Sequence, residues 1–208
     1  MTKLRYYFDY KSPYAYLAQE SAWQLSEALG SDFEMLPYTL QIPKYLGTAE
    51  LNEQGEDTVG TRNDHQWRRV KYSYMDCRRE ANRRGLTVRG PRKIFDSSVS
   101  HIGYFFVRDQ GDARAYHDAV FEQFWRRELD IESIDAVSSV MKSCGYDTSG
   151  FAEYLEGTGV ERYQETLIEA EARGVFGVPS YLFADDELYW GLERLPRVRE
   201  RLGLATDA

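Results

Sequence analysis

The sequence predicts an α/β fold that carries a large insertion made only of helices. Three observations lead to this prediction. Two short strand patterns flank a helical pattern within the first 40 residues, helical patterns alone fill the middle of the chain, and two further strand patterns lie between helices near its end. The predicted order is therefore β-α-β, a helical block, and α-β-β-α.

Turn and capping residues define the predicted limits of the first β-α-β unit. Leu4 to Asp9 is rich in aromatic residues and is followed by Tyr-Lys-Ser-Pro, which is typical of a strand that ends at a turn. Ser12 is a favourable N-cap and Pro13 fits a first helical position, so a helix is expected from there to Gly30. Phe33 to Leu40 has a second strand pattern, and the two strands are expected to be parallel.

Residues 42–155 are predicted to form the helical insertion. The segment from Gln41 to about Asn63 is polar and weakly periodic, and it is interpreted as a loop with short helical turns. Apolar residues at helical spacing then predict further helices, at residues 64–84, 98–108, 113–127, 133–144 and, briefly, after residue 148. The aromatic residues on these helices are interpreted as core.

The C-terminal part of the chain returns to strand patterns. Apolar residues three and four apart predict a helix from Thr158 to Ala172 that terminates at Gly174. Ser180 to Phe183 and Leu188 to Trp190 flank a tight turn and predict an antiparallel hairpin. A final helix is expected from about Leu192 to Leu202.

The assembled order is that of thioredoxin, with the insertion placed after the second strand. We therefore assign residues 1–41 and 156–208 to a discontinuous thioredoxin-like domain, and residues 42–155 to a helical insertion domain. Open α/β sheets bind ligands at the carboxyl ends of their strands. The loop that contains Lys11, Ser12 and Pro13 is thus the first candidate site.

Composition narrows the classes of function. The formal charge of -8 argues against a general nucleic-acid binder, because such affinity comes from clustered Lys and Arg. No run approaches the roughly 18 apolar residues of a membrane span, and the opening lacks a cleavage-site pattern, so a cytoplasmic protein without a membrane partner is expected. Cys77 and Cys144 are far apart and the three histidines are scattered, at positions 65, 101 and 117. No disulfide and no metal site is predicted.

The turn at Ser12-Pro13-Tyr14-Ala15 occupies the position where a thioredoxin-like oxidoreductase has Cys-x-x-Cys. A helix N-terminus favours a thiolate there, but this chain has neither cysteine. Ala15 cannot resolve a mixed disulfide, so sulfur chemistry would need a thiol from outside. The Ser12 hydroxyl could donate a hydrogen bond to that thiolate, or it could serve only as a helix cap.

The segment Gly174-Val-Phe-Gly-Val-Pro-Ser180 is the second candidate feature. A proline that opens a strand in this fold is commonly cis, and it exposes the N–H and C=O of the residue before it for pairing with a peptide-like ligand. We therefore predict that Val178-Pro179 is cis and lies within contact distance of the Ser12 hydroxyl. A trans proline at the start of a strand is the alternative.

One basic stretch, between Arg68 and Lys93, has two interpretations. A solvated helix face opposite acidic segments is the more frequent origin of such a run. The alternative is that one of its cations meets an anionic ligand.

Four segments resemble the 2-hydroxychromene-2-carboxylate isomerase and kappa-class glutathione transferase family. Tyr7 to Ala18, YFDYKSPYAYLA, resembles the family's YFDFxSPYSYLA, and Gly174 to Leu195, GVFGVPSYLFADDELYWGLERL, is similar to GVFGVPTFxxxGExFWGxDRL. Arg69 to Ala81, RVKYSYMDCRREA, resembles KLxYxxxDxxRxA, and Gly85 to Ser97 resembles GxPxxxPxxFPxNT. The resemblance therefore covers nearly the whole chain.

This resemblance implies a DsbA-like fold, a homodimer and bound glutathione, or another low-molecular-weight thiol. It implies that Ser12 holds the sulfur and that the main chain of Val178, beside Pro179, pairs with the cysteinyl part. The turn at Trp190, Leu192, Glu193 and Arg194 would contact the γ-glutamyl end.

The chain departs from the family pattern at four of these positions. Glu193 replaces an Asp, which keeps the charge on a longer arm, and Leu192 offers no side-chain hydrogen bond. Arg69 replaces a Lys that would face the glycyl carboxylate. Asp96 stands where Asn is usual, which brings a negative charge to the predicted pocket.

Three hypotheses follow for the function. The first is a glutathione-dependent isomerase, or a kappa-class transferase, which acts on a small aromatic or unsaturated substrate with Ser12 stabilising the thiolate. The second is a DsbA-type disulfide oxidoreductase, against which the missing CxxC argues. The third is a non-catalytic binding or scaffold protein that kept the fold and lost the chemistry, and the residues at 96, 192 and 193 keep this hypothesis open.

Overall fold

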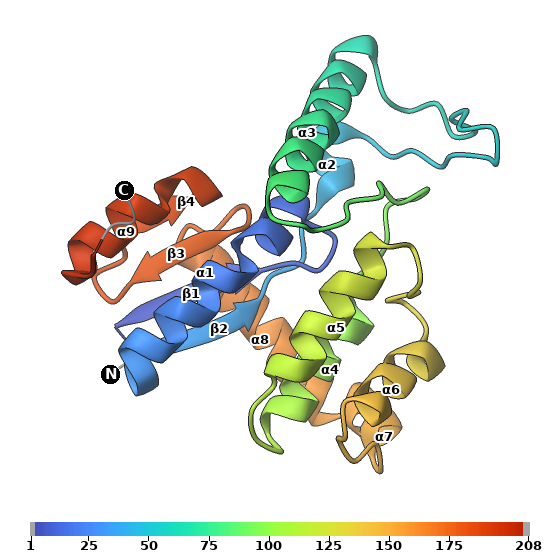
Figure 1. Cartoon of the computed structure of the whole chain (residues 1–208). Coiled ribbons are helices and arrows are strands. Elements are labelled where there is room, and N and C mark those ends of the chain that lie inside the picture. The colour runs from blue at the N-terminus through green and yellow to red at the C-terminus, as the bar shows by residue number, and fades with distance from the viewer. Residues whose placement is uncertain (1–2, 206–208) are drawn as a thin grey trace. The chain divides into compact units, whose positions relative to one another are not determined.

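A four-stranded sheet joins the two ends of the chain in one unit of the computed structural model, which describes residues 3–205 (Figure 1). Its strands lie in the order β2-β1-β3-β4, with β1 at Leu4–Phe8, β2 at Phe33–Pro37, β3 at Ser180–Phe183 and β4 at Leu188–Trp190. β1 runs parallel to β2 and antiparallel to β3, and β3 runs antiparallel to β4. The predicted parallel pair and the predicted hairpin are both confirmed.

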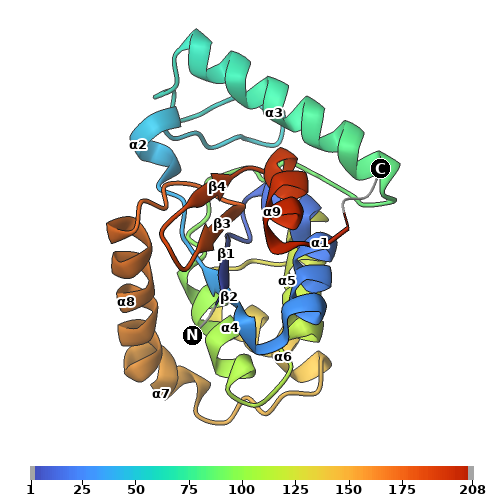
Figure 2. The same cartoon turned by 90° about the vertical axis from the view of Figure 1, so that its left-hand side faces the viewer.

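Two helices cover this sheet on opposite faces, as Figure 2 shows, namely α1 (Pro13–Leu29) and α8 (Thr158–Ala172). Side chains alternate along β1, so Tyr6 and Tyr7 point to opposite faces. On one face, Tyr6 packs against Tyr181 of β3 with ring centroids 5.3 Å apart. On the other, Arg5 forms ion pairs with Glu34 of β2 and with Glu169 of α8. The sheet is therefore apolar on its α1 side and partly charged beneath α8.

The chain divides into two compact units, one formed by residues 1–40 with 161–208 and the other by residues 41–160. The second unit is helical and contains α2 (Ile42–Leu46), α3 (Asp64–Arg83), α4 (Ser98–Arg108), α5 (Arg114–Trp125), α6 (Ile134–Ser143) and α7 (Phe151–Glu156). Each helix expected between residues 64 and 156 is present. The segment from residue 41 to residue 63 is interpreted from its sequence as a loop with short helical turns, and it contains the short helix α2.

Two predicted boundaries were wrong. β2 ends at Pro37 rather than at Leu40, because its partner strand β1 ends at Phe8 and the Leu40 N–H donates to Asp9 Oδ2 at 2.8 Å. The last helix is divided into a 3-10 turn, η2 (Leu192–Arg194), and α9 (Leu195–Leu202). Pro196 has no N–H to donate to the Leu192 carbonyl, so α-helical bonding cannot begin before Leu195.

Close packing in the helical unit depends on one glycine. A Cβ at Gly103 in α4 would lie 2.5 Å from Tyr116 Oη of α5 and 2.6 Å from Met141 Cε of α6. The Tyr116 hydroxyl donates to the Ser100 carbonyl at 2.9 Å. The glycine therefore lets three helices approach each other around a satisfied phenol, as buried polar groups require.

The cysteines and most of the histidines lie inside the protein. Cys77 is buried and Cys144 is partly buried, and no disulfide joins them. His101 and His117 are buried, whereas His65 is exposed on α3. Across residues 3–205 no helix has both the length and the apolarity to cross a membrane. In the same part of the chain, no group of His, Cys, Asp and Glu side chains could hold a metal ion.

His117 makes the stability of the protein depend on pH. Its ring packs edge-on against Tyr104 and Phe121, and burial, with a smaller effect of His101, lowers its pKa from 6.5 to about 3. The unfolded chain therefore binds a proton near pH 6.5 that the folded protein excludes. The contribution of His117 is complete above that pH and is lost as the pH falls toward about 3.

We expect urea unfolding to show a loss of about 1 to 2 kcal/mol between about pH 7 and about pH 5 from this residue. His117→Phe keeps the edge-on ring contacts and should have a flatter dependence of the unfolding free energy on pH. His65→Gln, at an exposed position, is the matched control and should retain the wild-type slope. Equal slopes for wild type and His117→Phe would contradict this assignment.

Candidate functional site

The turn between β1 and α1 holds Ser12 in a fixed position. The Ser12 N–H donates to the Asp9 carbonyl at 2.9 Å, and Pro13 is the first residue of α1. The Ser12 hydroxyl oxygen accepts the Ala15 N–H at 3.2 Å, which is the N-cap expected from the sequence. The capping role is therefore present, and it uses one lone pair of the hydroxyl.

The Val178-Pro179 bond is cis, and it faces this turn. Ser12 Oγ donates to the Val178 carbonyl oxygen at 3.5 Å, so the predicted cis bond and the predicted proximity are both confirmed. This distance is at the outer limit of hydrogen bonding, so the hydroxyl proton is only weakly held. Val178 is buried, and within residues 3–205 its N–H donates to no acceptor. Such a donor is rare in folded proteins and would suit a ligand carbonyl.

Two hydrogen bonds and one strand pairing hold the loop before β3. The Ser180 hydroxyl donates to the Gly177 carbonyl at 2.6 Å, and the Gly191 N–H donates to the Pro179 carbonyl at 2.9 Å. Ser180 also pairs with Tyr7 in the β1–β3 ladder. The loop is therefore fixed to both neighbouring strands, on either side of Val178.

Trp190 forms an aromatic surface beside this loop. Its ring centroid lies 5.0 Å from that of Phe176, and the two residues are 50% and 59% exposed. A Cβ at Gly177 would lie 2.5 Å from Trp190 Nε1. The indole therefore packs directly on the backbone of residue 177, and a larger residue there would displace it.

The η2 turn carries the other residues predicted at the γ-glutamyl end. Leu192 is half-buried, whereas Glu193 and Arg194 are exposed, with 4.0 Å between Glu193 Oε1 and Arg194 Nε. The Glu193 carboxylate lies over Gly191, where a Cβ would come within 2.5 Å of it. Gly191 in turn bonds to Pro179, so an acidic group lies close to the cis-proline. Such a group could bind an ammonium.

The charge on Glu193 also affects the sheet below. Burial, followed by this carboxylate, raises the pKa of Tyr181 above its usual value. Burial, followed by Tyr181, raises the pKa of Tyr6 in the same way. Both phenols therefore stay neutral, and neither hydroxyl has a hydrogen-bond partner among the described residues.

A buried ion pair lies beneath the Ser12 turn. Lys11 Nζ is 3.2 Å from Asp9 Oδ2, and their side chains are 4% and 0% exposed. The other carboxylate oxygen, Asp9 Oδ1, accepts the Lys11 N–H at 3.1 Å. Sequence reasoning named Lys11 only as part of the loop and did not identify Asp9. An Asp two residues before a turn residue is a local signal that could have revealed the link.

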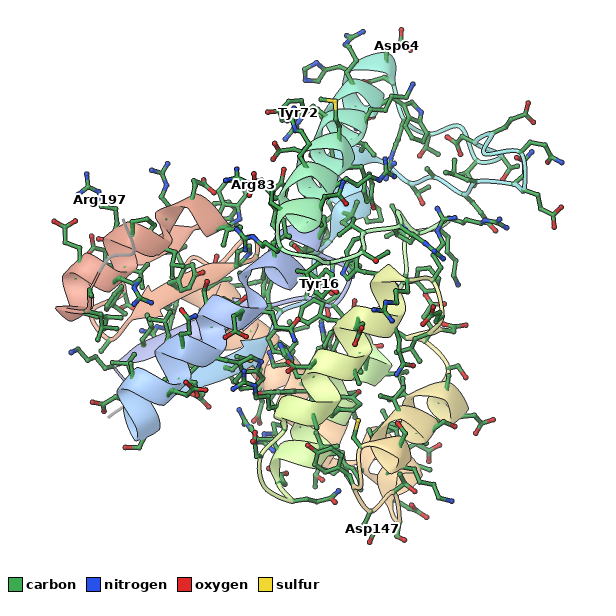
Figure 3. The ribbon with its side chains drawn as sticks, in the orientation of Figure 1. Tyr16, Asp64, Tyr72, Arg83, Asp147 and Arg197 are labelled. Carbon is green, nitrogen blue, oxygen red and sulfur yellow. The ribbon has the colours of Figure 1, made fainter. Side chains whose placement is uncertain are left out.

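The two remaining predicted residues, Arg69 and Asp96, belong to the helical unit. Arg69 is exposed on α3, in an open groove lined by His65, Arg68, Arg69, Tyr72 and Ser73. Figure 3 shows Tyr72 projecting from α3 between Asp64 and Arg83 at its two ends. Their contacts with glutathione stay predictions.

The structure gives Asp96 a local role. Asp96 Oδ1 accepts the Ser98 N–H at 3.0 Å at the start of α4, and the Asp96 N–H donates to Glu132. Lys93 forms an ion pair with the same glutamate. An acid at this position therefore stabilises the start of a helix, independently of any ligand.

Comparisons with known proteins agree with this arrangement. The family model of the DSBA-like thioredoxin domain matches residues 3–203. A 2-hydroxychromene-2-carboxylate isomerase from Pseudomonas putida is 29% identical over 203 residues, which are 95% of this chain and 93% of that protein. One from Sphingobium xenophagum is 27% identical over 197 residues, with 94% and 95% covered.

The fold is also similar to that of solved structures. The structure of a 2-hydroxychromene-2-carboxylate isomerase has a TM-score of 0.70 at 25% identity, and the match covers 96% of this chain and 94% of that one. The match of the family model over nearly all of the described chain, together with the predicted and observed thioredoxin-like order, decides the classification. This chain belongs to the DSBA-like thioredoxin domain family.

Proposed function

We propose that this chain is a glutathione-dependent isomerase of the 2-hydroxychromene-2-carboxylate isomerase type, which acts on a small aromatic or unsaturated substrate. The observation that carries the proposal is the placement of the Ser12 hydroxyl against Val178, whose N–H donates to no acceptor among the described residues. The names of relatives that are 27% to 29% identical support an isomerase rather than a kappa-class transferase.

The residues of the first unit fit glutathione at three points. The Ser12 hydroxyl would donate to its sulfur, and the N–H and C=O of Val178 would pair with its cysteinyl main chain. The Glu193 carboxylate, close to Pro179 through Gly191, would meet its ammonium. When bound, the thiol would supply a nucleophile that adds reversibly to an electrophilic carbon.

Ser12 can act as a donor without ceasing to be a cap. Its hydroxyl has one proton and two lone pairs, and the cap to Ala15 uses only a lone pair. The proton now points to the Val178 carbonyl at 3.5 Å, so little is lost when it turns to an anion. The N-terminal dipole of the 17-residue helix α1 favours negative charge at the same place.

The chain has no thiol of its own for this chemistry at the turn. Positions 12 and 15 are Ser and Ala, and the two cysteines lie at 77 and 144 in the helical unit. Disulfide exchange at the turn is therefore not expected, and insulin reduction at a high rate would contradict the proposal. Assembly as a homodimer and a cytoplasmic location stay part of the proposal and are tested by sedimentation and by fractionation.

The proposal requires that glutathione binds and that activity depends on it. Calorimetric titration should show one site per chain. Isomerisation of a 2-hydroxychromene-2-carboxylate should be lost when glutathione is omitted and return when it is added. Binding without activity would instead favour the non-catalytic thiol-binding protein.

Ser12→Ala is expected to lower turnover by roughly tenfold to a hundredfold, because a hydrogen bond to a charged partner contributes about 1.5 to 3 kcal/mol. It should also cost about 1 kcal/mol of stability through loss of the cap. Ser133→Ala is a matched control, because Ser133 caps α6 by accepting the Ala136 N–H at the same 3.2 Å. Steady-state kinetics and urea unfolding of both variants separate the two roles. If Ser12→Ala loses stability but keeps full activity, Ser12 serves only as a helix cap.

Glu193→Gln is expected to weaken glutathione binding by roughly tenfold, because it removes the charge that would meet the ammonium. Glu193→Asp should retain most of the affinity, and binding of N-acetylcysteine, which has no ammonium, should be the same for all three proteins. Glu200→Gln, at another exposed acid in the same unit, is the control. Calorimetric titration measures these affinities. Equal losses for both thiols would argue against a γ-glutamyl contact.

A further inference from the structure

We propose that the buried Asp9–Lys11 ion pair is a positioning pair that holds the Ser12 turn and balances the electrostatic potential at the side chain of residue 12. The inference rests on the proposed thiol-dependent function, because only an anion at that position would make the balance useful. It assigns a role to two residues that the fit to glutathione does not use.

The carboxylate of Asp9 connects three parts of the first unit. Oδ1 accepts the Lys11 N–H at 3.1 Å, and Oδ2 accepts the Leu40 N–H at 2.8 Å and meets Lys11 Nζ at 3.2 Å. The main-chain carbonyl of the same residue accepts the Ser12 N–H at 2.9 Å. Asp9 therefore ties the end of β1, the turn before α1 and the segment after β2 to one another, and Ser12 is held at the centre of these contacts.

Stability alone does not explain two buried charges at this place. Removing a carboxylate and an ammonium from water costs several kcal/mol for each, and apolar side chains of the same size are often as stabilising as the pair. The side chains of Lys11 and Asp9 are nevertheless 4% and 0% exposed. Both precede Ser12, whose Cα is only about 3.8 Å from that of Lys11. A role in the electrostatics of residue 12 accounts for this placement.

The two charges act on an anion at residue 12 with opposite signs. The carboxylate disfavours it and the ammonium favours it, and burial weakens the screening of both. The negative charge of Asp9 also affects Tyr38. Burial first, and then Glu171 and Asp9, raise the pKa of Tyr38 to about 12. Lys11 is therefore needed to offset an acid that the turn requires for its geometry.

A cysteine introduced at position 12 would report this potential without any ligand. Ser12→Cys places a thiol at the site, and the pKa of this thiol is measured from the ultraviolet absorbance of its thiolate. The absorbance of the protein with Ser12 is subtracted, which removes the contribution of Cys77 and Cys144. On this background we expect Lys11→Met to raise the thiol pKa by about one unit or more and Asp9→Asn to lower it by a similar amount. The double substitution should return the pKa close to that of Ser12→Cys alone.

Two further variants keep the test decisive if Asp9→Asn fails to fold. Lys11→Arg retains the charge and should leave the thiol pKa close to that of Ser12→Cys. Lys3→Met removes an exposed lysine from the same unit and should also leave it unchanged. An unchanged pKa in Lys11→Met, or shifts of the same sign in Lys11→Met and Asp9→Asn, would overturn the inference.

The outcome is separable from that of the proposed function. If the pKa shifts appear but the wild-type chain does not bind glutathione, the electrostatic role stands and the proposed cofactor is wrong. If glutathione binds and the shifts are absent, the proposed function stands and the ion pair is only structural. In the Ser12 protein, Lys11→Met should lower kcat while KM changes little, because the thiol would still dock on Val178.

Discussion

The antiparallel pairing of β1 with β3 is the interaction on which the candidate site depends. Ser12 and Val178 are 166 residues apart in the sequence, and they meet because Tyr7, one residue before the end of β1, pairs with Ser180, the first residue of β3. Because the two strands are antiparallel, the residues that follow β1 and those that precede β3 lie at the same end of the strand pair. The main-chain pairing of these strands therefore brings the hydroxyl, the cis-proline loop and the Trp190 surface together.

The candidate site keeps the main-chain arrangement of a thioredoxin turn without its cysteines. A helix N-terminus and a cis-proline loop remain from the thioredoxin arrangement, whereas Ser12 and Ala15 replace the two thiols. A serine in this position leaves a cap and a weakly held proton, and it leaves the Val178 N–H for a ligand. Under the proposed function, the chain would therefore bind an external thiol instead of supplying a cysteine thiol of its own.

The sequence predicted the elements that local chemistry determines. Ser12 and Pro13 correctly predicted the start of a helix. The alternating strand patterns on either side of Asp185 and Asp186 correctly predicted a hairpin. Prediction failed where backbone bonds depend on distant partners, as at the end of β2, where the Leu40 N–H turns to Asp9. The packing of Trp190 on Gly177 and the Asp9–Lys11 pair were missed for the same reason. Sequence spacing shows which residues are near a turn but not which of their polar groups will be buried together.

The insertion of residues 41–160 also determines when the site can form. During synthesis β1 and β2 can pair early, but the other edge of β1 has no partner until residues 180–183 have been made. An unpaired strand edge is a place where chains associate wrongly, and long-range closure is slow. Ser12 is translated 166 residues before Val178, so it acquires its carbonyl neighbour long after its own turn has been made. A truncated chain that stops before β3 would therefore carry the complete helix cap and an open, aggregation-prone sheet edge.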